Sequence, residues 1–424
     1  MSFYCLVKHC LWLTNAKLLK ISGFMVKVKL IFALLSLFSL NGFAQSLVIS
    51  GKVLDAENNE PLVFASVRIK GKSLGTISNL NGEFDFYLPA DFRNEIITIS
   101  YLGHENFETP VWAMVDKPGY IIRLKASPLV LDEILVSDQI RGGELLRIAL
   151  ERIEHNYPTN PFMLDGFYRD LKQVGGTYFA LLEAAVKIYD DGYKNPRNKY
   201  KLRENVSLIE VRKSVGYNNK FTAYFEQHNL LEDLLLHNNV RYRQFDNSDI
   251  FFNGLGRLPN TIYNNKEVFV VYQYEPYLLK IFIDKNSYAI IRLEYEIKAS
   301  NEIISKRKNM YSSFSGLKKV IDFKEFEGKM YLEYMELTST VNWYDIKTDE
   351  LKFETGLFQQ LLINNIEPSP EYRINSTEKM KRYGLQYQDR DYNEAFWENY
   401  NVIKDSPLDK KIIDDLNRQV LSGN

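Results

Sequence analysis

Short alternating segments separated by turn residues, at residues 49–103, constrain the fold more than any other feature of the sequence. Apolar and polar residues alternate in three segments, as half-buried strands require. The apolar members are Ala65, Val67, Ile69, Phe84, Phe86, Leu88, Ile97, Ile99 and Tyr101. Between the segments lie stretches such as GKSLGT and NLNGE, whose Asn and Gly residues favour turns. This pattern predicts a small antiparallel β-sandwich of the seven-stranded type over residues 46–125.

Residues 1–44 are typical of an export signal. They contain five lysines and no acidic residue, and they end in an apolar run followed by NGFAQ. A basic start, a short apolar core and small residues before the cut predict a secretory signal peptide cleaved before Gln45. The alternative is an uncleaved anchor, but the run is shorter than the roughly 20 residues that span a bilayer. Met25 begins a signal of more ordinary length, so we expect the native start there.

The composition of the exported chain limits its chemistry. Cleavage removes Cys5 and Cys10, so we expect no disulfide, no cysteine nucleophile and no thiolate metal site. Removing five lysines from a net charge of −1 leaves −6, which argues against a nucleic-acid partner. The sequence contains neither H-E-x-x-H, nor H-x-x-E, nor a phosphate-binding glycine motif. We therefore predict no metal and no cofactor. We expect a periplasmic or outer-membrane-associated protein, not an integral helical membrane protein.

Residues 46–125 resemble the carboxypeptidase-regulatory-like domain, a transthyretin-like sandwich. The matching residues are Gly51, Val53, Asp55, Pro61, Leu62, Ala65, Val67, Gly71, Gly75, Thr76, Ser78, Asn79, Gly82, Phe84, Ser100, Tyr101 and Gly103. The resemblance implies a non-catalytic module that accompanies peptidases and precedes the plug of many outer-membrane receptors of Bacteroidetes-type bacteria. Neither a peptidase domain nor a receptor barrel follows it in this sequence.

The rest of the chain is predicted to form a larger curved antiparallel sheet over residues 161–375, with a few packed helices. Strands dominate this range; one example is Ile291 to Ile297, where apolar residues alternate with charged ones. A linker with an amphipathic helix occupies residues 126–160, and a second helix near 221–236 is expected to lie on the sheet. Residues 376–424 are predicted to be a polar segment and a C-terminal helix that starts at Ser406. The predicted fold class is mainly β, of the α+β type.

The larger region also resembles known proteins. DGFYRD, KIFIDKNSYAIIRLEYEI and FWENYNVI are similar to segments of poorly characterised exported Bacteroidetes proteins that carry the same sandwich. The order strand, DK.SYAI, strand is similar to lipoprotein carriers of the LolA type, whose half-open sheets, or half-barrels, hold acyl chains against a helix. The first resemblance implies no established activity. The second concerns architecture, which does not fix function.

A set of polar residues on two predicted strands is the most site-like feature of the sequence. We predict a ligand-binding role for Tyr168, Arg169, Asp170, Glu183 and Tyr189. A hairpin turn between the two strands would bring Arg169 close to Glu183, and a cross-strand ion pair is the simpler interpretation of that pair.

Motifs for catalysis are weaker, and no catalytic residue is assigned. The run Gly71 to Gly75 matches the G-x-S-x-G pattern of serine hydrolases, but it lies between two sandwich strands, whereas that nucleophile needs a strand-to-helix turn. The carboxylates Glu294 and Glu296 lie beside Arg292 on a strand face that we expect to be solvated.

These observations favour a non-enzymatic cell-envelope binding or assembly protein. The sandwich would be an interaction module for an outer-membrane or periplasmic protein partner, and the larger sheet would hold an apolar (lipid) or glycan ligand. One alternative is a hydrolase of unrecognised type that acts on envelope glycan or peptide. The other is an accessory component of an outer-membrane receptor system.

Overall fold

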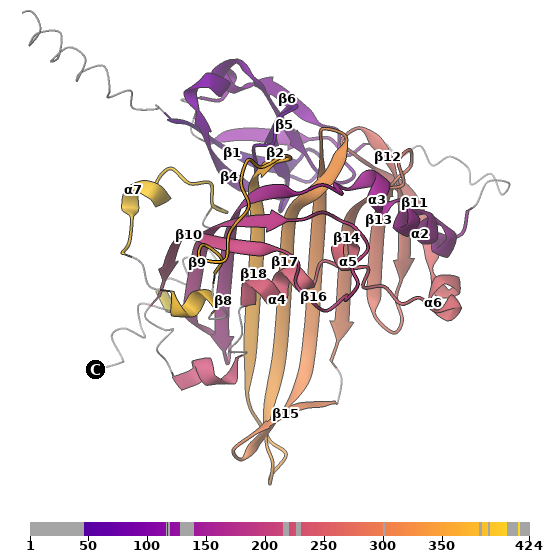
Figure 1. Ribbon diagram of the computed structural model, residues 1–424, viewed down its shortest axis with the longest axis vertical. Coiled ribbons are helices and arrows are strands. Elements are labelled where there is room, and N and C mark those ends of the chain that lie inside the picture. Colours follow the sequence, from indigo (N-terminus) through magenta and orange to yellow (C-terminus); the bar gives the residue numbers. More distant parts are fainter. Residues whose placement is uncertain are drawn as a thin grey trace, which may run out of the picture. The chain divides into compact units, whose positions relative to one another are not determined.

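The computed structural model describes residues 46–115, 117, 119–127, 140–214, 220–225, 230–299, 302–380, 384–388, 391–404 and 414–415. The predicted export signal and most of the predicted C-terminal helix lie outside the described residues. Strands dominate the described part of the chain (Figure 1), which confirms the predicted mainly-β fold class.

The N-terminal strands form the predicted sandwich. One sheet has the order β4-β1-β7 and the other the order β3-β2-β5-β6. The strands are β1 (Ser46–Asp55), β2 (Ser66–Ile69), β3 (Gly75–Ile77), β4 (Glu83–Pro89), β5 (Ile96–Ser100), β6 (Phe107–Pro110) and β7 (Tyr120–Leu124), with short 3-10 helices η1 (Ala90–Asn94) and η2 (Val111–Ala113). Val67, Phe84 and Ile99, which the alternation predicts to face inward, are fully buried between the sheets.

One detail of the sandwich differs from the prediction. β1 and β7 pair in parallel, from Gly51 opposite Tyr120 to Asp55 opposite Leu124, so the sandwich is not wholly antiparallel. Alternation identifies the buried face of a strand but carries no information on its direction, which explains the error.

The larger region forms an 11-stranded sheet whose recorded strand pairs are all antiparallel. Its order is β10-β9-β8-β18-β17-β16-β14-β13-β12-β11, and β15 pairs with part of β16. The strands are β8 (Phe162–Val174), β9 (Thr177–Asp190), β10 (Asn205–Lys213), β11 (Gly256–Tyr263), β12 (Lys266–Gln273), β13 (Leu278–Asp284), β14 (Ile290–Lys298), β15 (Ile303–Arg307), β16 (Met310–Phe326), β17 (Lys329–Asp345) and β18 (Leu351–Glu367).

Short helices accompany this sheet. They are α2 (Gly142–Glu151), α3 (Ile153–Asn156), η4 (Lys220–Tyr224), α4 (Leu230–Leu236), α5 (Asn239–Tyr242), α6 (Asp249–Gly254), η5 (Leu385–Tyr387) and α7 (Glu394–Trp397). The predicted linker helix corresponds to α2 and α3. The predicted helix near 221–236 is helical at both ends, in η4 and α4, with residues 226–229 between them outside the described part.

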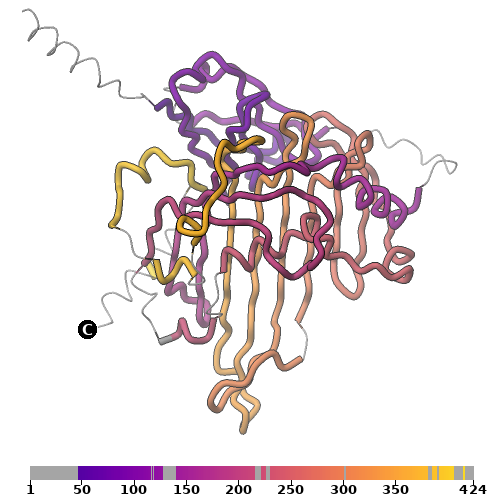
Figure 2. Tube along the Cα trace, in the orientation of Figure 1, coloured from indigo at the N-terminus to yellow at the C-terminus, as the bar shows by residue number. Residues whose placement is uncertain are grey.

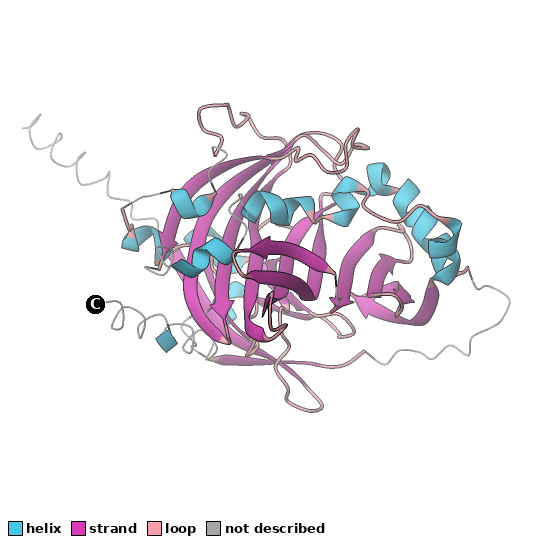
Figure 3. Ribbon diagram, turned by 90° about the horizontal axis from the view of Figure 1, so that it is seen from below, coloured by secondary structure: helices cyan, strands magenta, loops and turns pink. Residues whose placement is uncertain are grey.

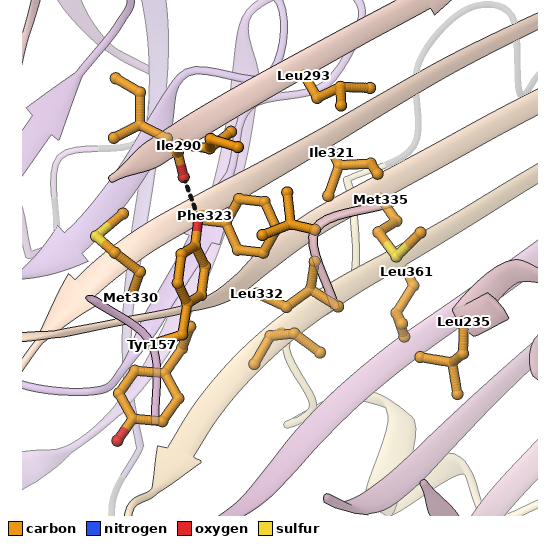
Figure 4. Close-up of a cluster of buried hydrophobic side chains, with 14 of the residues drawn as sticks. Tyr157, Leu235, Ile290, Leu293, Ile321, Phe323, Met330, Leu332, Met335 and Leu361 are labelled. Atoms are coloured by element: carbon orange, nitrogen blue, oxygen red, sulfur yellow. Dashed lines mark hydrogen bonds between the residues drawn. The ribbon is translucent and has the colours of Figure 1, made fainter. Parts of the chain in front are cut away.

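One face of the large sheet is covered by helices α2 to α6, and we call it the helix face (Figure 3). Leu235 of α4 packs there beside Leu361, Met335 and Ile321 (Figure 4). Close backbone contact between α2 and α6 depends on glycine, because a Cβ on Gly143 would lie 2.0 Å from the Phe252 carbonyl oxygen. The helix face therefore forms the apolar core of this region.

The opposite face of the sheet is covered by the sandwich and by residues 394–404, which we call the C-terminal segment. Ile77 of the sandwich and Trp397 of the C-terminal segment pack there against Phe167, Tyr334 and Leu362. We call this the sandwich face. Figure 2 shows the yellow end of the described trace next to the indigo sandwich, although the two are far apart in the sequence.

The sandwich face corrects one prediction. Arg292 and Glu294 alternate with core residues on β14 and were expected to be solvated. Their side chains are instead largely buried and line a cavity together with residues of the sandwich. Alternation correctly indicates that these side chains point away from the apolar core. It cannot indicate that another part of the chain covers them.

Candidate functional site

The five predicted site residues lie on β8 and β9 but do not share one site. Neighbouring residues on a strand point to opposite faces of its sheet. Arg169 and Glu183 lie on the sandwich face, whereas Tyr168 and Asp170 lie on the helix face. Tyr189 packs with Met163 and Ile374 in a separate small cluster.

Arg169 and Glu183 pair as the hairpin predicts. They lie opposite each other in the β8–β9 register, and Nε of Arg169 donates to Oε1 of Glu183 at 2.6 Å. The other oxygen of Glu183 accepts from Nε of Arg212, on β10, at 2.5 Å. Burial alone would raise the pKa of Glu183, but the two guanidinium groups outweigh it and lower that pKa. Glu183 is therefore an ionised, buried carboxylate held between two arginines.

Tyr168 and Asp170 belong to a separate buried group that joins β8 to α4. Oδ1 of Asp170 lies 2.7 Å from Nζ of Lys172. The amide of Gln359 donates to the Tyr168 hydroxyl at 2.9 Å and to the carbonyl oxygen of Leu230 at 2.8 Å. These contacts fix the position of α4 on the sheet.

The C-terminal segment lies across the Arg169–Glu183–Arg212 cluster. The guanidinium of Arg212 lies 4.5 Å from the centre of the Trp397 ring, and Nη2 of Arg169 donates to the carbonyl oxygen of Ile403 at 3.3 Å. The hydroxyl of Tyr400 donates to the carbonyl oxygen of Gly166, on β8, at 2.9 Å. The predicted polar residues on this face thus hold the segment in place.

The same segment also binds the sandwich. The Asn401 side chain accepts from the Tyr87 amide at 2.8 Å and donates to the Tyr87 carbonyl at 3.1 Å, so it bonds β4 as a neighbouring strand would. Nζ of Lys404 lies 2.8 Å from Oδ1 of Asp85. The C-terminal segment therefore bridges the sandwich and the large sheet.

A hollow of about 290 Å³ opens where the sandwich, the large sheet and the C-terminal segment meet. We call it the junction groove. Its apolar and aromatic lining consists of Phe64, Leu80, Leu171, Tyr178, Phe358 and Ile403. Its polar lining consists of Asn79, Arg169, Lys318, Glu336, Thr338, Gln359, Gln360 and Lys404. The wall combines apolar and aromatic side chains with a larger number of polar ones, and its volume is close to the lower limit for a small-molecule site.

A second hollow, the interface cavity, lies between the sandwich and the sheet and measures about 150 Å³. Glu333 accepts from the Ser66 hydroxyl at 2.7 Å and lies 3.9 Å from Nε of Arg68. Arg292 pairs with Asp322 at 2.7 Å and with Glu294 at 2.8 Å. Burial raises the pKa of Asp322 to about 6, although Arg292 opposes the shift. Carboxylates and guanidinium groups therefore alternate across this interface.

The sequence analysis missed a further buried network at the end of β9. Arg241 of α5 is fully buried, and it donates to Asp190 through Nε at 2.7 Å and through Nη2 at 2.6 Å. Glu204 accepts from the Tyr242 hydroxyl, and burial together with the nearby Asp190 raises the pKa of Glu204 to about 7. The Asp190–Asp191 pair was visible in the sequence, but its arginine lies some fifty residues away.

Among the residues that the structure describes, no helix combines the length and the apolar character needed to cross a bilayer. Within the same residues, no three His, Cys, Asp or Glu side chains gather as metal ligands would.

The solved structures that this chain matches are distant. Lipovitellin, in a structure described by its lipid–protein interactions, is 12% identical; the match covers 55% of this chain and 28% of that one, with a TM-score of 0.24. A putative membrane-associated protein of unknown function from Bacteroides fragilis is 8% identical over 76% of this chain and 98% of that one, with a TM-score of 0.15. TM-scores this low do not establish a shared fold.

A family model and a curated relative each match part of the sequence. Residues 49–136 match the model of the CarboxypepD_reg-like domain. The TonB-dependent receptor SusC of Bacteroides thetaiotaomicron is 32% identical over 118 residues, which are 28% of this chain and 11% of SusC. The chain therefore spans about a tenth of the curated relative that it matches. These findings confirm the predicted resemblance: the chain carries a CarboxypepD_reg-like domain near its N-terminus, related in sequence to part of SusC.

Proposed function

We propose that this protein is a non-enzymatic binding or assembly protein of the cell envelope that works beside an outer-membrane receptor. The chain carries a CarboxypepD_reg-like domain, and over 118 aligned residues it is 32% identical to part of a TonB-dependent receptor. The predicted signal at residues 1–44 would bring the protein to the periplasm or the outer membrane. In this proposal the sandwich contacts the protein partner and the rest of the molecule holds a ligand.

The junction groove is the observation that carries the proposal. Three separate parts of the chain form its walls, so its shape depends on the assembled molecule. Tyr178 and Phe358, whose ring centres lie 6.0 Å apart, offer an apolar surface on which a sugar ring or an acyl chain can pack. Lys318 and the amide of Gln360 supply polar contacts beside it. An amphipathic ligand, either a short glycan or a small lipid, matches this lining.

The ligand proposal can be tested by native mass spectrometry of the protein purified from its own host. We expect an additional mass that is released on denaturation, and chemical analysis of it would distinguish a glycan from a lipid. Replacing Thr338 by Trp fills the groove and should abolish the additional mass, and Lys318→Gln should weaken its retention. Lys201→Gln, which changes an exposed lysine on a distant loop, is the matched control. A folded protein without any bound molecule, which also fails to bind envelope glycans or lipids, would refute the proposal.

A hydrolase is the second candidate, because the interface cavity collects three carboxylates. Glu294, Asp322 and Glu333 all line it, and the raised pKa of Asp322 is a property that catalytic acids often have. Screening against peptidoglycan, oligosaccharides and peptides should be done with Asp322→Asn beside Asp170→Ala and Glu183→Ala. Turnover that Asp322→Asn alone abolishes, while the fold is retained, would favour the hydrolase over the binding protein.

A further inference from the structure

The lining of the junction groove changes from charged to apolar across the large sheet. The strand register aligns one residue from each of five neighbouring strands, namely Lys318 (β16), Thr338 (β17), Phe358 (β18), Leu171 (β8) and Leu181 (β9). The first four of them line the groove. Because neighbouring strands lie about 4.8 Å apart, this part of the row is roughly 14 Å long. A ligand that lies across the strands would therefore meet a charge at one end and hydrocarbon at the other.

The apolar end of the row is a small hydrophobic cluster. Leu171 and Tyr178 are buried there, and Leu181 and Phe358 pack against them. Ile403 of the C-terminal segment adds a further apolar side chain to the lining. Sugar hydroxyls buried against such side chains would lose their hydrogen bonds to water without gaining others, which costs free energy. A hydrocarbon chain therefore matches this end of the groove.

The other end of the row carries two charges with unused hydrogen-bonding capacity. The Lys318 side chain is exposed, and its ammonium makes no hydrogen bond or ion pair recorded among the described residues, although Glu296 lies opposite it on β14. Oε2 of Glu336 accepts from the Tyr334 hydroxyl at 2.8 Å, whereas no bond to its Oε1 is recorded in the same part of the chain. Glu336 lies two residues from Thr338, so its side chain is on the same face of the sheet as that of Lys318.

The other charged side chains of the lining are already paired. Arg169 pairs with Glu183, and Lys404 pairs with an aspartate of the sandwich. Lys318 and Glu336 are therefore the lining charges that a ligand can bind without breaking a recorded ion pair. They occupy diagonal positions on adjacent strands, roughly 7 Å apart. A headgroup whose anion and cation are separated by two carbon atoms can bridge them.

We propose that the junction groove binds a single-chain phospholipid with a zwitterionic headgroup, such as lysophosphatidylethanolamine, an inference that rests on the ligand-binding function proposed above. Lys318 binds the phosphate, and Glu336 accepts hydrogen bonds from the ammonium group. The acyl chain lies across β18 and β8, along Phe358 and Leu171. The volume of about 290 Å³ is near the lower limit of small-molecule sites, which favours one acyl chain over two.

Titration calorimetry of the exported protein, freed of co-purified molecules, tests this proposal. The probes are lysophosphatidylethanolamine and lysophosphatidylglycerol with the same acyl chain, below the concentrations at which they form micelles. The first should bind about tenfold more tightly or better, because only its headgroup offers Glu336 an ammonium. Lys318→Glu and Glu336→Lys should each weaken its binding about tenfold or more. The two substitutions combined should recover most of the affinity, because the headgroup can then bind in the reverse orientation.

The control exchanges Lys352 and Glu350, an ion pair outside the groove, and should leave the affinity unchanged. Circular dichroism checks the fold of each variant, and Glu336→Gln replaces Glu336→Lys if the latter does not fold. Equal affinity of the wild type for the two lipids would overturn the proposal, as would a folded double variant that binds no better than the single ones. A bound glycan that Thr338→Trp removes would overturn the lipid assignment and leave the proposed binding function standing. A wild type that binds neither lipids nor glycans would refute both.

Discussion

The two faces of the large sheet are built from different chemistry. On the helix face, side chains such as Ile321, Phe323 and Leu361 are fully buried among other apolar groups. On the sandwich face, buried contacts run through charged and polar side chains, including Arg169, Glu183 and Glu333. The helix face is therefore mainly apolar, with a few buried ion pairs such as Arg241–Asp190, whereas the sandwich face combines a smaller apolar cluster with several buried charges.

This difference indicates different roles. Apolar burial is non-directional, so the helix face gains stability from any well-fitted packing. A buried charge is tolerated only when it is paired with an opposite charge or hydrogen-bonded. An arrangement that leaves it unpaired costs several kcal/mol, on the order of 3 to 5. The sandwich face thus selects one arrangement of the sandwich and the C-terminal segment, whereas the helix face provides most of the stability.

The largest expected effect is on the helix face. Phe323→Ala removes a fully buried ring that packs edge-on against Tyr157 at 5.3 Å. We expect the free energy of unfolding to fall by about 3–5 kcal/mol because a cavity remains. Urea denaturation measures this loss, with Ile250→Ala as an exposed control that should change stability little. If Phe323→Ala lowered the free energy of unfolding by less than Glu183→Gln does, the helix face would not be the main source of stability.

Glu183→Gln tests the sandwich face. The substitution leaves Arg169 and Arg212 without their shared carboxylate, and we expect a loss of about 3 kcal/mol. The partly exposed pair of Lys52 and Glu83, at 3.6 Å, is the control, because Glu83→Gln should cost less than about 1 kcal/mol. Equal losses in the two variants would mean that burial of the charge has no influence.

Asn401→Ala tests whether the C-terminal segment holds the sandwich in place. It removes both hydrogen bonds to Tyr87, and we expect about 1–2 kcal/mol of local destabilisation. Hydrogen exchange should accelerate in β4 and in residues 394–404 and remain unchanged in α4. The exposed Asn253→Ala is the matched control, and unchanged exchange in β4 would show that the segment does not hold the sandwich.

The pH dependence of the sandwich face tests the paired charges without removing one of them. The pKa of Asp322 is raised from 3.8 to about 6, so the folded protein holds this proton more tightly than the unfolded chain does. The contribution is therefore present below pH 4 and is lost as pH rises through 6, by about 2 kcal/mol between pH 4.5 and pH 7.5 for a shift of roughly two pKa units. Urea titrations at pH 4.5 and pH 7.5 measure it as the difference between wild type and Asp322→Asn. An identical pH dependence in both proteins would contradict this assignment.

Short-range patterns in the sequence correctly predicted the strands and the hairpin pairing, because neighbouring residues determine both. Alternation located the sandwich core, and the predicted hairpin turn, which the structure places at Gly175 and Gly176 between β8 and β9, brings Arg169 opposite Glu183. Neither pattern specifies contacts between distant segments. The cover over Arg292, the Arg241 network and the bridge at Asn401 all join residues far apart in the chain, so only the folded structure reveals them.

The place of β18 in the sheet has a consequence for how this protein folds. β18 lies between β8 and β17, and its residue Thr355 pairs with Val174, about 180 positions earlier. Before β18 is added, the strands form two separate meanders, β10-β9-β8 and β17 to β11, and each exposes one edge, β8 or β17, that β18 later covers. Contacts this far apart in the chain close slowly. A nascent polypeptide arrested before residue 351 would therefore expose two adhesive edges, and cells producing it would need chaperones to keep it from aggregating.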